Sequence, residues 1–292
     1  MASTSASSAP TRATLGSGDA VGPSVLAEGA IAIDLAPALA AYRDVGYARL
    51  APGRSVVSSE ALSAMRARAD DIMLGCVVHE GLFFQHDSES GRYDDLRLGE
   101  GYKGPSLDYR KIEKLERDPL FLEWIENPLF ERIARAVISE DVVLYRAVLF
   151  TKGLRGGTVL PFHQDGGEFW GLDRDPVLQL WTALDDAPIE AGCVEVVPGS
   201  HHAGLATRNG GVVPNDRVEA ANVEGRVVPL PAVAGEVLLI HNHLWHRSAR
   251  NSTGKTRRAL NLCFMPASTR CRRKKRTPRV FFPLFSKRPG GP

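Results

Sequence analysis

Residues 142–150 read VVLYRAVLF, and this stretch opens a second half of the chain whose pattern differs from that of the first half. Further short runs of β-branched or alternating apolar residues follow it, bounded by Gly, Pro, Asp or Asn, at 177–184, 193–197, 226–230, 236–241 and 259–265. Such runs are typical of β-strands. Six short strands after a helical half predict a mainly β protein with flanking helices and an antiparallel double sheet of jelly-roll type.

The preceding segment, from about 57 to 140, has a largely helical pattern. Ser58 stands before apolar residues at helical spacing, and Asp118-Pro119 and Asn127-Pro128 each pair a capping side chain with a proline suited to the first helical position. These signals predict helices at 59–75, 119–126 and 128–138. We expect the helices to buttress one sheet rather than to form a separate domain.

The two ends of the chain have compositions of their own. Residues 1–25 contain almost no large apolar side chains and are expected to be a disordered leader. Residues 268–292 carry nine Lys or Arg and no acid, and form a basic tail. Between them we expect a single domain at 26–267, with the helical buttress at about 57–140 and the jelly-roll core at about 141–267.

Composition excludes several classes of protein. Without the nine positive charges of the tail, the formal net charge of +2 becomes about −7, a poor match for nucleic acid. No stretch reaches the roughly 18 consecutive apolar residues of a membrane span. The four cysteines show no Cys-x-x-Cys pair. We therefore expect a soluble, cytoplasmic protein that binds neither nucleic acid nor zinc, and the sequence leaves its oligomeric state unknown.

The segment LPFHQDGGEFW (160–170) places His163 and Asp165 two positions apart. On an extended strand both side chains point to the same face, with their Cα atoms about 7 Å apart, so that both can reach one metal ion. A His-x-Asp pair is common by chance. A third ligand must come from elsewhere, and His241, His243 and His246 directly follow a predicted strand.

Four ordered motifs carry a family resemblance. They are HQD at 163–165, LQLWTALDDA at 178–187, AGCVEVVPGSHH at 191–202, and HRSARN with an arginine eleven positions after the histidine, from 246 to 257. In these segments the chain resembles the phytanoyl-CoA dioxygenase family of iron(II)- and 2-oxoglutarate-dependent oxygenases. The resemblance implies a double-stranded β-helix core of jelly-roll or cupin-like type, with Fe(II) as cofactor and 2-oxoglutarate and O2 as co-substrates.

The resemblance also implies roles for individual residues. The residues that match the iron ligands, and hence the catalytic centre, are His163, Asp165 and His246. Arg257 matches the arginine that receives the distal carboxylate of 2-oxoglutarate, helped by Ser248. The positions that match further residues of the co-substrate pocket are Lys111, Trp181 and Gln164. His241 and His243 fall outside the pattern and are expected not to bind the metal.

The chemistry of these residue types agrees with that assignment. Two imidazoles and one carboxylate on one face of iron leave three positions open, and a guanidinium can bind a carboxylate through two parallel hydrogen bonds. The expected activity is a dioxygenase that hydroxylates or otherwise oxidises a small molecule, in a biosynthetic pathway, with release of succinate and CO2. Asp165 favours hydroxylation over halogenation, because related halogenases carry a small residue in place of this carboxylate.

Two other functions fit the predicted fold. One is a cupin-like metal enzyme that does not use 2-oxoglutarate, and Arg257 argues against it. The other is a non-catalytic jelly-roll binding protein whose metal site has decayed. In such a protein at least one ligand or the arginine should be missing, and none is missing.

Overall fold

Two antiparallel sheets face each other in the computed structural model, which describes residues 24–97, 99–274 and 278–286. The larger sheet contains, in spatial order, β1 (Tyr47–Arg49), β10 (Val237–His241), β6 (Leu178–Ala183), β12 (Arg257–Pro266), β4 (Val142–Lys152), β3 (Tyr109–Glu113) and β2 (Phe83–His86), with β13 (Phe282–Phe285) also paired to β4. The smaller sheet contains β8 (Gly211–Val212), β5 (Leu160–Gln164), β11 (His246–Ser248), β7 (Val194–Val196) and β9 (Val228–Leu230). This is the predicted double sheet.

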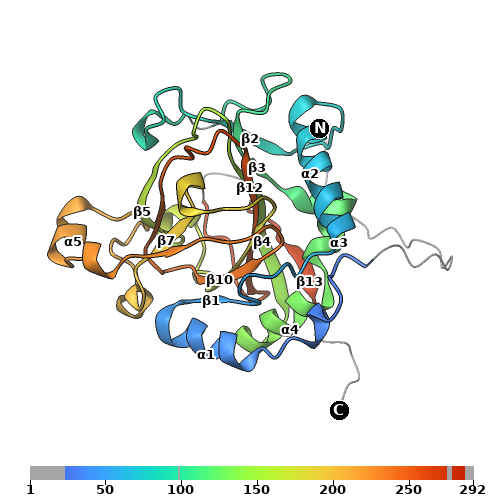
Figure 1. The fold of residues 1–292 in the computed structure, drawn as a ribbon. Coiled ribbons are helices and arrows are strands. Elements are labelled where there is room, and N and C mark those ends of the chain that lie inside the picture. Colours follow the sequence, from blue (N-terminus) through green and yellow to red (C-terminus); the bar gives the residue numbers. More distant parts are fainter. Residues whose placement is uncertain (1–23, 98, 275–277, 287–292) are drawn as a thin grey trace, which may run out of the picture.

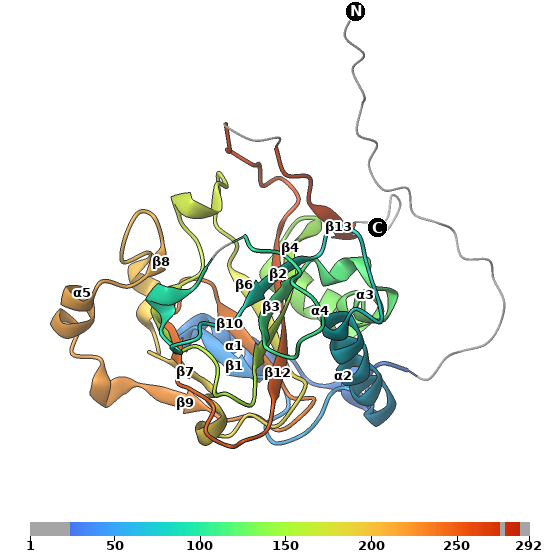
Figure 2. The same ribbon diagram turned by 90° about the horizontal axis from the view of Figure 1, so that it is seen from above.

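Four of the α-helices lie beside the larger sheet (Figure 1). They are α1 (Ala36–Val45), α2 (Ser59–Leu74), α3 (Pro119–Ile125) and α4 (Pro128–Val137), whereas α5 (Asn215–Ala220) projects from the side of the smaller sheet (Figure 2). Short 3-10 turns complete the described elements: η1 (Ala30–Ala32), η2 (Tyr93–Asp95), η3 (Leu115–Arg117), η4 (Glu168–Trp170), η5 (Ile189–Ala191), η6 (Ser200–Ala203) and η7 (Glu224–Arg226).

The helix ends follow the capping signals of the sequence. Ser58 accepts a hydrogen bond from the Ala61 amide, and Asp118 accepts two at the start of α3. Asn127 accepts one from the Phe130 amide. These caps satisfy backbone N–H groups that have no partner within the helix. The three helices predicted from these residues are confirmed to within one residue at their C-terminal ends.

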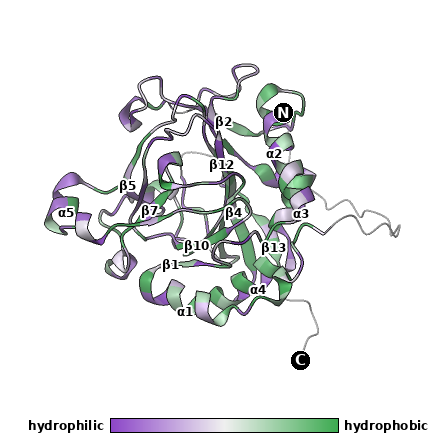
Figure 3. Ribbon diagram, in the orientation of Figure 1, coloured by the Kyte–Doolittle hydropathy of each residue, from purple (hydrophilic) through white to green (hydrophobic). Residues whose placement is uncertain are grey.

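Residues of the larger sheet alternate between two cores. On β6, Leu178 and Leu180 pack with the helices, whereas Trp181 and Ala183 pack between the two sheets. Both faces of these strands are therefore covered, which explains why they are apolar almost throughout. Hydrophobic colouring runs along the long strands beside the helices in Figure 3, and α5 is largely hydrophilic. The inner face of the larger sheet, which faces the smaller sheet, is the surface on which a binding site can form.

The structure adds strands where the sequence predicted none. β2 and β3 lie between the predicted helices and extend the larger sheet beyond β4. At the other end of β4, β13 brings the aromatic residues of the basic tail against the sheet, where Phe285 is buried. The 79–110 segment thus contributes β2 and the first two residues of β3 to the larger sheet.

The predicted leader lies outside the described residues except for its last two positions. Val25 accepts a hydrogen bond from the Ser58 amide, so the described chain begins in contact with α2. Among the described residues, no helix combines the length and the apolar character that crossing a lipid bilayer requires.

Candidate functional site

A cavity of about 540 Å³ lies between the two sheets. Inward-facing residues of β3, β4, β6 and β12 line it from the larger sheet, and residues of β5 and β11 line it from the smaller one. The segment around η2 and the exposed Phe169 of η4 also contribute to its wall. Its volume is in the range of pockets that bind small molecules.

Two histidine rings face each other in this cavity. His163 on β5 and His246 on β11 are paired across the smaller sheet, and their ring centroids are 4.0 Å apart. The Nδ1 atom of His163 is 2.9 Å from the Pro161 carbonyl oxygen, and that of His246 is 2.8 Å from the Leu244 carbonyl oxygen. With Nδ1 donating to a carbonyl, each ring keeps the Nε2 lone pair for a metal, as is usual for metal-binding histidines.

Asp165 completes this group at the end of β5. Its backbone amide donates to the Asn242 carbonyl over 2.8 Å, and its Oδ2 lies 3.8 Å from His246 Nε2. Its other carboxylate oxygen, Oδ1, accepts a hydrogen bond of 3.0 Å from Arg146. In the described part of the chain, no three His, Cys, Asp or Glu side chains form a group that could hold a metal ion in their present positions. His163, Asp165 and His246 nevertheless lie together, with the carboxylate held by a neighbouring arginine.

Burial and neighbouring charges set the protonation of this group. Burial and, after it, the charge of the adjacent His246 lower the pKa of His163 to about 3. Burial would raise the pKa of Asp165, but Arg146 and the two histidines bring it below its ordinary value. The group thus presents a neutral imidazole and an ionised carboxylate, which are the forms that bind metal ions.

Stacking contacts with aromatic side chains hold Arg146 in place. Its guanidinium lies 4.5 Å from the Trp170 ring centroid, and Trp170 stacks on Tyr145 at 4.5 Å and 10°. Arg279, from the C-terminal segment, stacks on the Tyr145 ring at 4.5 Å and donates to its hydroxyl oxygen over 2.9 Å. The end of the described chain therefore supports the wall of the cavity beside Asp165.

Arg257 and Lys152 occupy another part of the cavity wall. They are paired at one end of β12 and β4, and their exposed fractions are only 4% and 5%. Arg257 donates to the Gly192 carbonyl over 2.8 Å, its Nε has no partner among the described residues, and its guanidinium carbon lies 5.9 Å from the Trp181 ring centroid. Lys152 donates to the Thr158 carbonyl over 2.6 Å. Neither cation forms an ion pair with a described residue.

Because both side chains are buried and neither Arg257 nor Lys152 has an acidic partner among the described residues, the pKa values of both are lowered. Burial lowers the pKa of Arg257 to about 10. Burial and, after it, the charge of Arg257 lower the pKa of Lys152 to about 6. A buried cation without a counter-charge is costly, so this end of the cavity is suited to an anionic ligand.

The other residues predicted for the co-substrate pocket also line the cavity. Ser248 and Trp181 are buried in its wall. Gln164 lines it too, but its side-chain amide bonds to the backbone of Gly204, Ala206 and His243 and so anchors the following loop. Lys111 is ion-paired with Glu113 on the same strand. The structure thus brings all the predicted site residues to one cavity, with Gln164 and Lys111 already bonded to other groups.

The two histidines expected not to bind the metal belong to a different cluster. His243 is paired with Asp175 at 3.0 Å, and the His241 ring lies 4.9 Å from that of His201. Neither lines the main cavity.

Sequence reasoning missed Arg146 and Lys152. Both lie on β4, and together with Val148 and Phe150 they occupy alternate positions of that strand. A cation within an apolar strand was the available signal, because a charged group on the buried face of a strand needs a partner or a ligand.

Comparison with known proteins identifies relatives of this chain. The family model described as Phytanoyl-CoA dioxygenase (PhyH) matches residues 42–259. The zebrafish (Danio rerio) phytanoyl-CoA dioxygenase domain-containing protein 1 is 31% identical over 251 residues, which are 74% of this chain and 84% of that protein. The bovine (Bos taurus) protein of the same name is 31% identical over 159 residues, and the match spans about half (54%) of its length.

Solved structures share the fold at lower sequence identity. EctD from S. alaskensis, solved with 2-oxoglutarate and 5-hydroxyectoine, superposes with a TM-score of 0.67 at 19% identity and covers 91% of each chain. The epimerase SnoN, in complex with Fe3+, alpha ketoglutarate and nogalamycin RO, gives a TM-score of 0.64 at 18% identity, over 87% of this chain and 96% of that chain. These likenesses confirm the predicted class of mainly β fold with a jelly-roll core.

Proposed function

Because this chain belongs to the phytanoyl-CoA dioxygenase (PhyH) family, we propose that it is an iron(II)- and 2-oxoglutarate-dependent oxygenase that oxidises a small organic molecule. In this proposal His163, Asp165 and His246 hold the iron, and Arg257 holds the far carboxylate of 2-oxoglutarate. The observation that carries the proposal is the cavity itself. It joins two histidines and a carboxylate to a buried arginine that lacks an acidic partner.

The donor set fits iron(II). Two imidazole nitrogens and one carboxylate are the ligands of the facial triad, which leaves coordination positions for other molecules. Each histidine is oriented by a backbone carbonyl at Nδ1, and Asp165 is oriented by Arg146. These contacts leave Nε2 of both rings and Oδ2 of the carboxylate as the atoms that would bind the metal. When bound, iron would supply the oxidation chemistry, with 2-oxoglutarate and O2 as co-substrates and succinate and CO2 as products.

The chain's own residues would bind and orient the reactants. Arg257 offers a planar fork of donors to the distal carboxylate, and Ser248 offers a hydroxyl group in the same wall. Trp181 closes the wall beside the arginine and keeps water from the ion pair. Removing water strengthens each of these electrostatic contacts.

The reaction that we propose is hydroxylation, desaturation or ring formation. Asp165 is present and ionised, so the site keeps the carboxylate that a halogenase would lack. A cavity of about 540 Å³ suits a small-molecule substrate in addition to the co-substrate. We further propose that the protein works in the cytoplasm on a free metabolite of a biosynthetic pathway.

An anaerobic titration tests the proposal directly. Adding 2-oxoglutarate to the iron(II)-loaded protein should produce a weak visible charge-transfer band, and admitting air should then yield succinate. Arg257→Ala should strongly weaken the band at the concentrations that just saturate the unmodified protein. Iron binding with no band and no succinate would instead support a cupin-like metal enzyme, and no iron binding at all would support a non-catalytic binding protein.

A further inference from the structure

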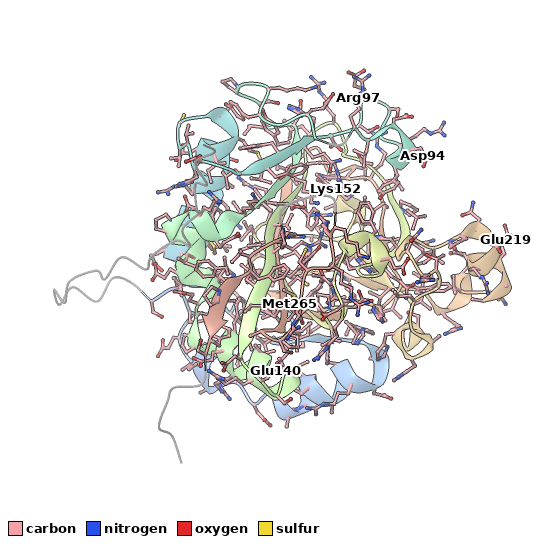
Figure 4. All side chains as sticks on the ribbon, turned by 180° about the vertical axis from the view of Figure 1, so that it is seen from behind. Asp94, Arg97, Glu140, Lys152, Glu219 and Met265 are labelled. Carbon is pink, nitrogen blue, oxygen red and sulfur yellow. The ribbon has the colours of Figure 1, made fainter. Side chains whose placement is uncertain are left out.

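Lys152 is a buried cation of the cavity to which the proposed function gives no role. It lies opposite Arg257 in the pairing of β4 with β12, and both side chains line the cavity. Figure 4 shows Lys152 within the molecule, with Asp94 and Arg97 on the outer rim and Glu140 near the opposite end of the structure. Among the described residues, its Nζ donates one hydrogen bond, to the Thr158 carbonyl, so that the ammonium form keeps two of its three N–H donors for a ligand.

We propose that Lys152 is a second anchor for the distal carboxylate of 2-oxoglutarate, and that this dianion binds together with one proton taken from solvent. The inference rests on the proposed function, because it needs the co-substrate to occupy the Arg257 end of the cavity. The proton comes from water or buffer and ends on Lys152 Nζ, so the uncharged amine becomes an ammonium group beside the carboxylate.

The groups that face Lys152 explain why the proton is absent before the co-substrate binds. Burial above all, and then the charges of Arg257 on β12, Arg110 on β3 and Arg250 in the loop after β11, lower its pKa to about 6. Asp87, after β2, acts in the opposite direction, but it is bonded to the Thr158 amide and hydroxyl group. At pH 7.5 Lys152 is therefore mostly neutral in the empty cavity.

A carboxylate placed between Lys152 and Arg257 reverses this balance. The new negative charge favours the ammonium form and raises the pKa of Lys152 above neutrality. Binding and protonation are then linked, and the affinity for 2-oxoglutarate is greatest near or below pH 6. Above pH 6 the affinity should fall about tenfold per pH unit, until the pH reaches the pKa of Lys152 in the complex.

Calorimetry can count this proton. 2-Oxoglutarate is titrated anaerobically into the iron(II)-loaded protein at pH 7.5, in HEPES and in Tris, two buffers whose ionisation enthalpies differ. A difference in observed heat that corresponds to uptake of about one proton per 2-oxoglutarate supports the inference. Equal observed heats in the two buffers, which mean no proton uptake, overturn it, and this result needs no variant.

Two substitutions assign the proton to a residue. Lys152→Met should abolish proton uptake and weaken 2-oxoglutarate binding about tenfold at pH 6.5. Lys152→Arg, which is always charged, should keep the affinity, make it independent of pH between 6 and 8, and take up no proton. Lys103→Met is the matched control, because Lys103 pairs with Glu100 outside the cavity. It should leave both the proton count and the affinity unchanged.

The outcomes separate this inference from the proposed function. If the iron-loaded protein shows no heat with 2-oxoglutarate, the proposed function fails. If 2-oxoglutarate binds and Arg257→Ala weakens it, but Lys152→Met keeps both the affinity and the proton uptake, only the role of Lys152 fails. Proton uptake that persists in Lys152→Arg also overturns the assignment.

Discussion

At one part of the cavity Arg146 and Asp165 neutralise each other, whereas at another part Arg257 and Lys152 lie side by side without an acidic partner among the described residues. The first group is bonded before any ligand arrives, through two histidine–carbonyl contacts and the Arg146–Asp165 ion pair. The second group is desolvated and bonded to carbonyl oxygens only. One part is therefore organised in advance, and the other is completed by its ligand.

The two parts of the cavity should therefore contribute differently to the free energy of ligand binding. A preorganised metal site loses little entropy when the metal binds, because its rings and carboxylate are already oriented. In contrast, two buried cations without a counter-charge interact unfavourably, and the binding of an anion removes this cost. The first part should thus determine metal affinity, and the second should determine co-substrate affinity and its dependence on pH. The following substitutions test whether these two properties separate.

The largest effect is expected for His246→Ala. Loss of a ligand should weaken iron(II) binding by more than about 100-fold, because even changes to residues that only orient the ligands cost about 10- to 100-fold. Anaerobic competition with an iron(II) chelator measures this. His202→Ala is the control, since His202 bonds to the Asp44 carbonyl outside the cavity. Unchanged iron affinity in His246→Ala would remove His246 from the metal site.

Arg146→Met should affect the stability of the metal-free protein. It leaves Asp165 as a buried carboxylate without its partner and should lower the free energy of unfolding by about 3 kcal/mol. Denaturant unfolding, with and without iron(II), measures this change. Metal binding should restore more stability to the variant than to the unmodified protein, because the metal replaces the missing positive charge. Equal stability of the two metal-free proteins would show that the ion pair contributes nothing net.

Arg257→Ala should weaken 2-oxoglutarate binding by about 30-fold, because it removes charge-assisted hydrogen bonds worth about 2 kcal/mol. Iron affinity should change less than threefold, since Arg257 contacts none of the proposed metal ligands. Arg257→Lys should recover only part of the loss, because an ammonium group cannot form the planar fork. Titration followed by the charge-transfer band gives both constants. Equal losses of iron and 2-oxoglutarate affinity would mean that the two parts of the cavity are not separable.

Ser248→Ala should have the smallest effect. A neutral hydrogen bond contributes about 1 kcal/mol, so 2-oxoglutarate binding should weaken about fivefold while iron affinity stays the same. The same titration measures it. A loss as large as that of Arg257→Ala would indicate that the substitution disturbs β11, which also carries His246.

Local chemistry made the helices predictable from the sequence. Asp118 and Asn127 cap their helices through contacts within three residues, and each precedes a proline at the first helical position. A short stretch of sequence is therefore enough to predict where these helices begin. The strands β6 and β12 were predictable in the same way, because a short run of mostly apolar residues marks each of them.

The parts that escaped prediction depend on distant contacts. β11 is a short, polar strand that pairs with β5 and β7, both distant from it in sequence. β13 depends on β4, to which the chain returns after a long excursion. The motifs indicated His163, Asp165 and His246, but the Arg146–Asp165 contact joins the two sheets across the cavity, and no spacing in the sequence encodes it. The roles of these residues as ligands remain a prediction.

The position of β12 has a consequence for how this protein is made. β12 lies between β6 and β4, although it is synthesised long after both of them. A growing chain that has not yet reached residue 257 therefore holds two apolar strands whose edges lack their native neighbour, and exposed edges of this kind promote aggregation. Fragments that stop before this point should be insoluble.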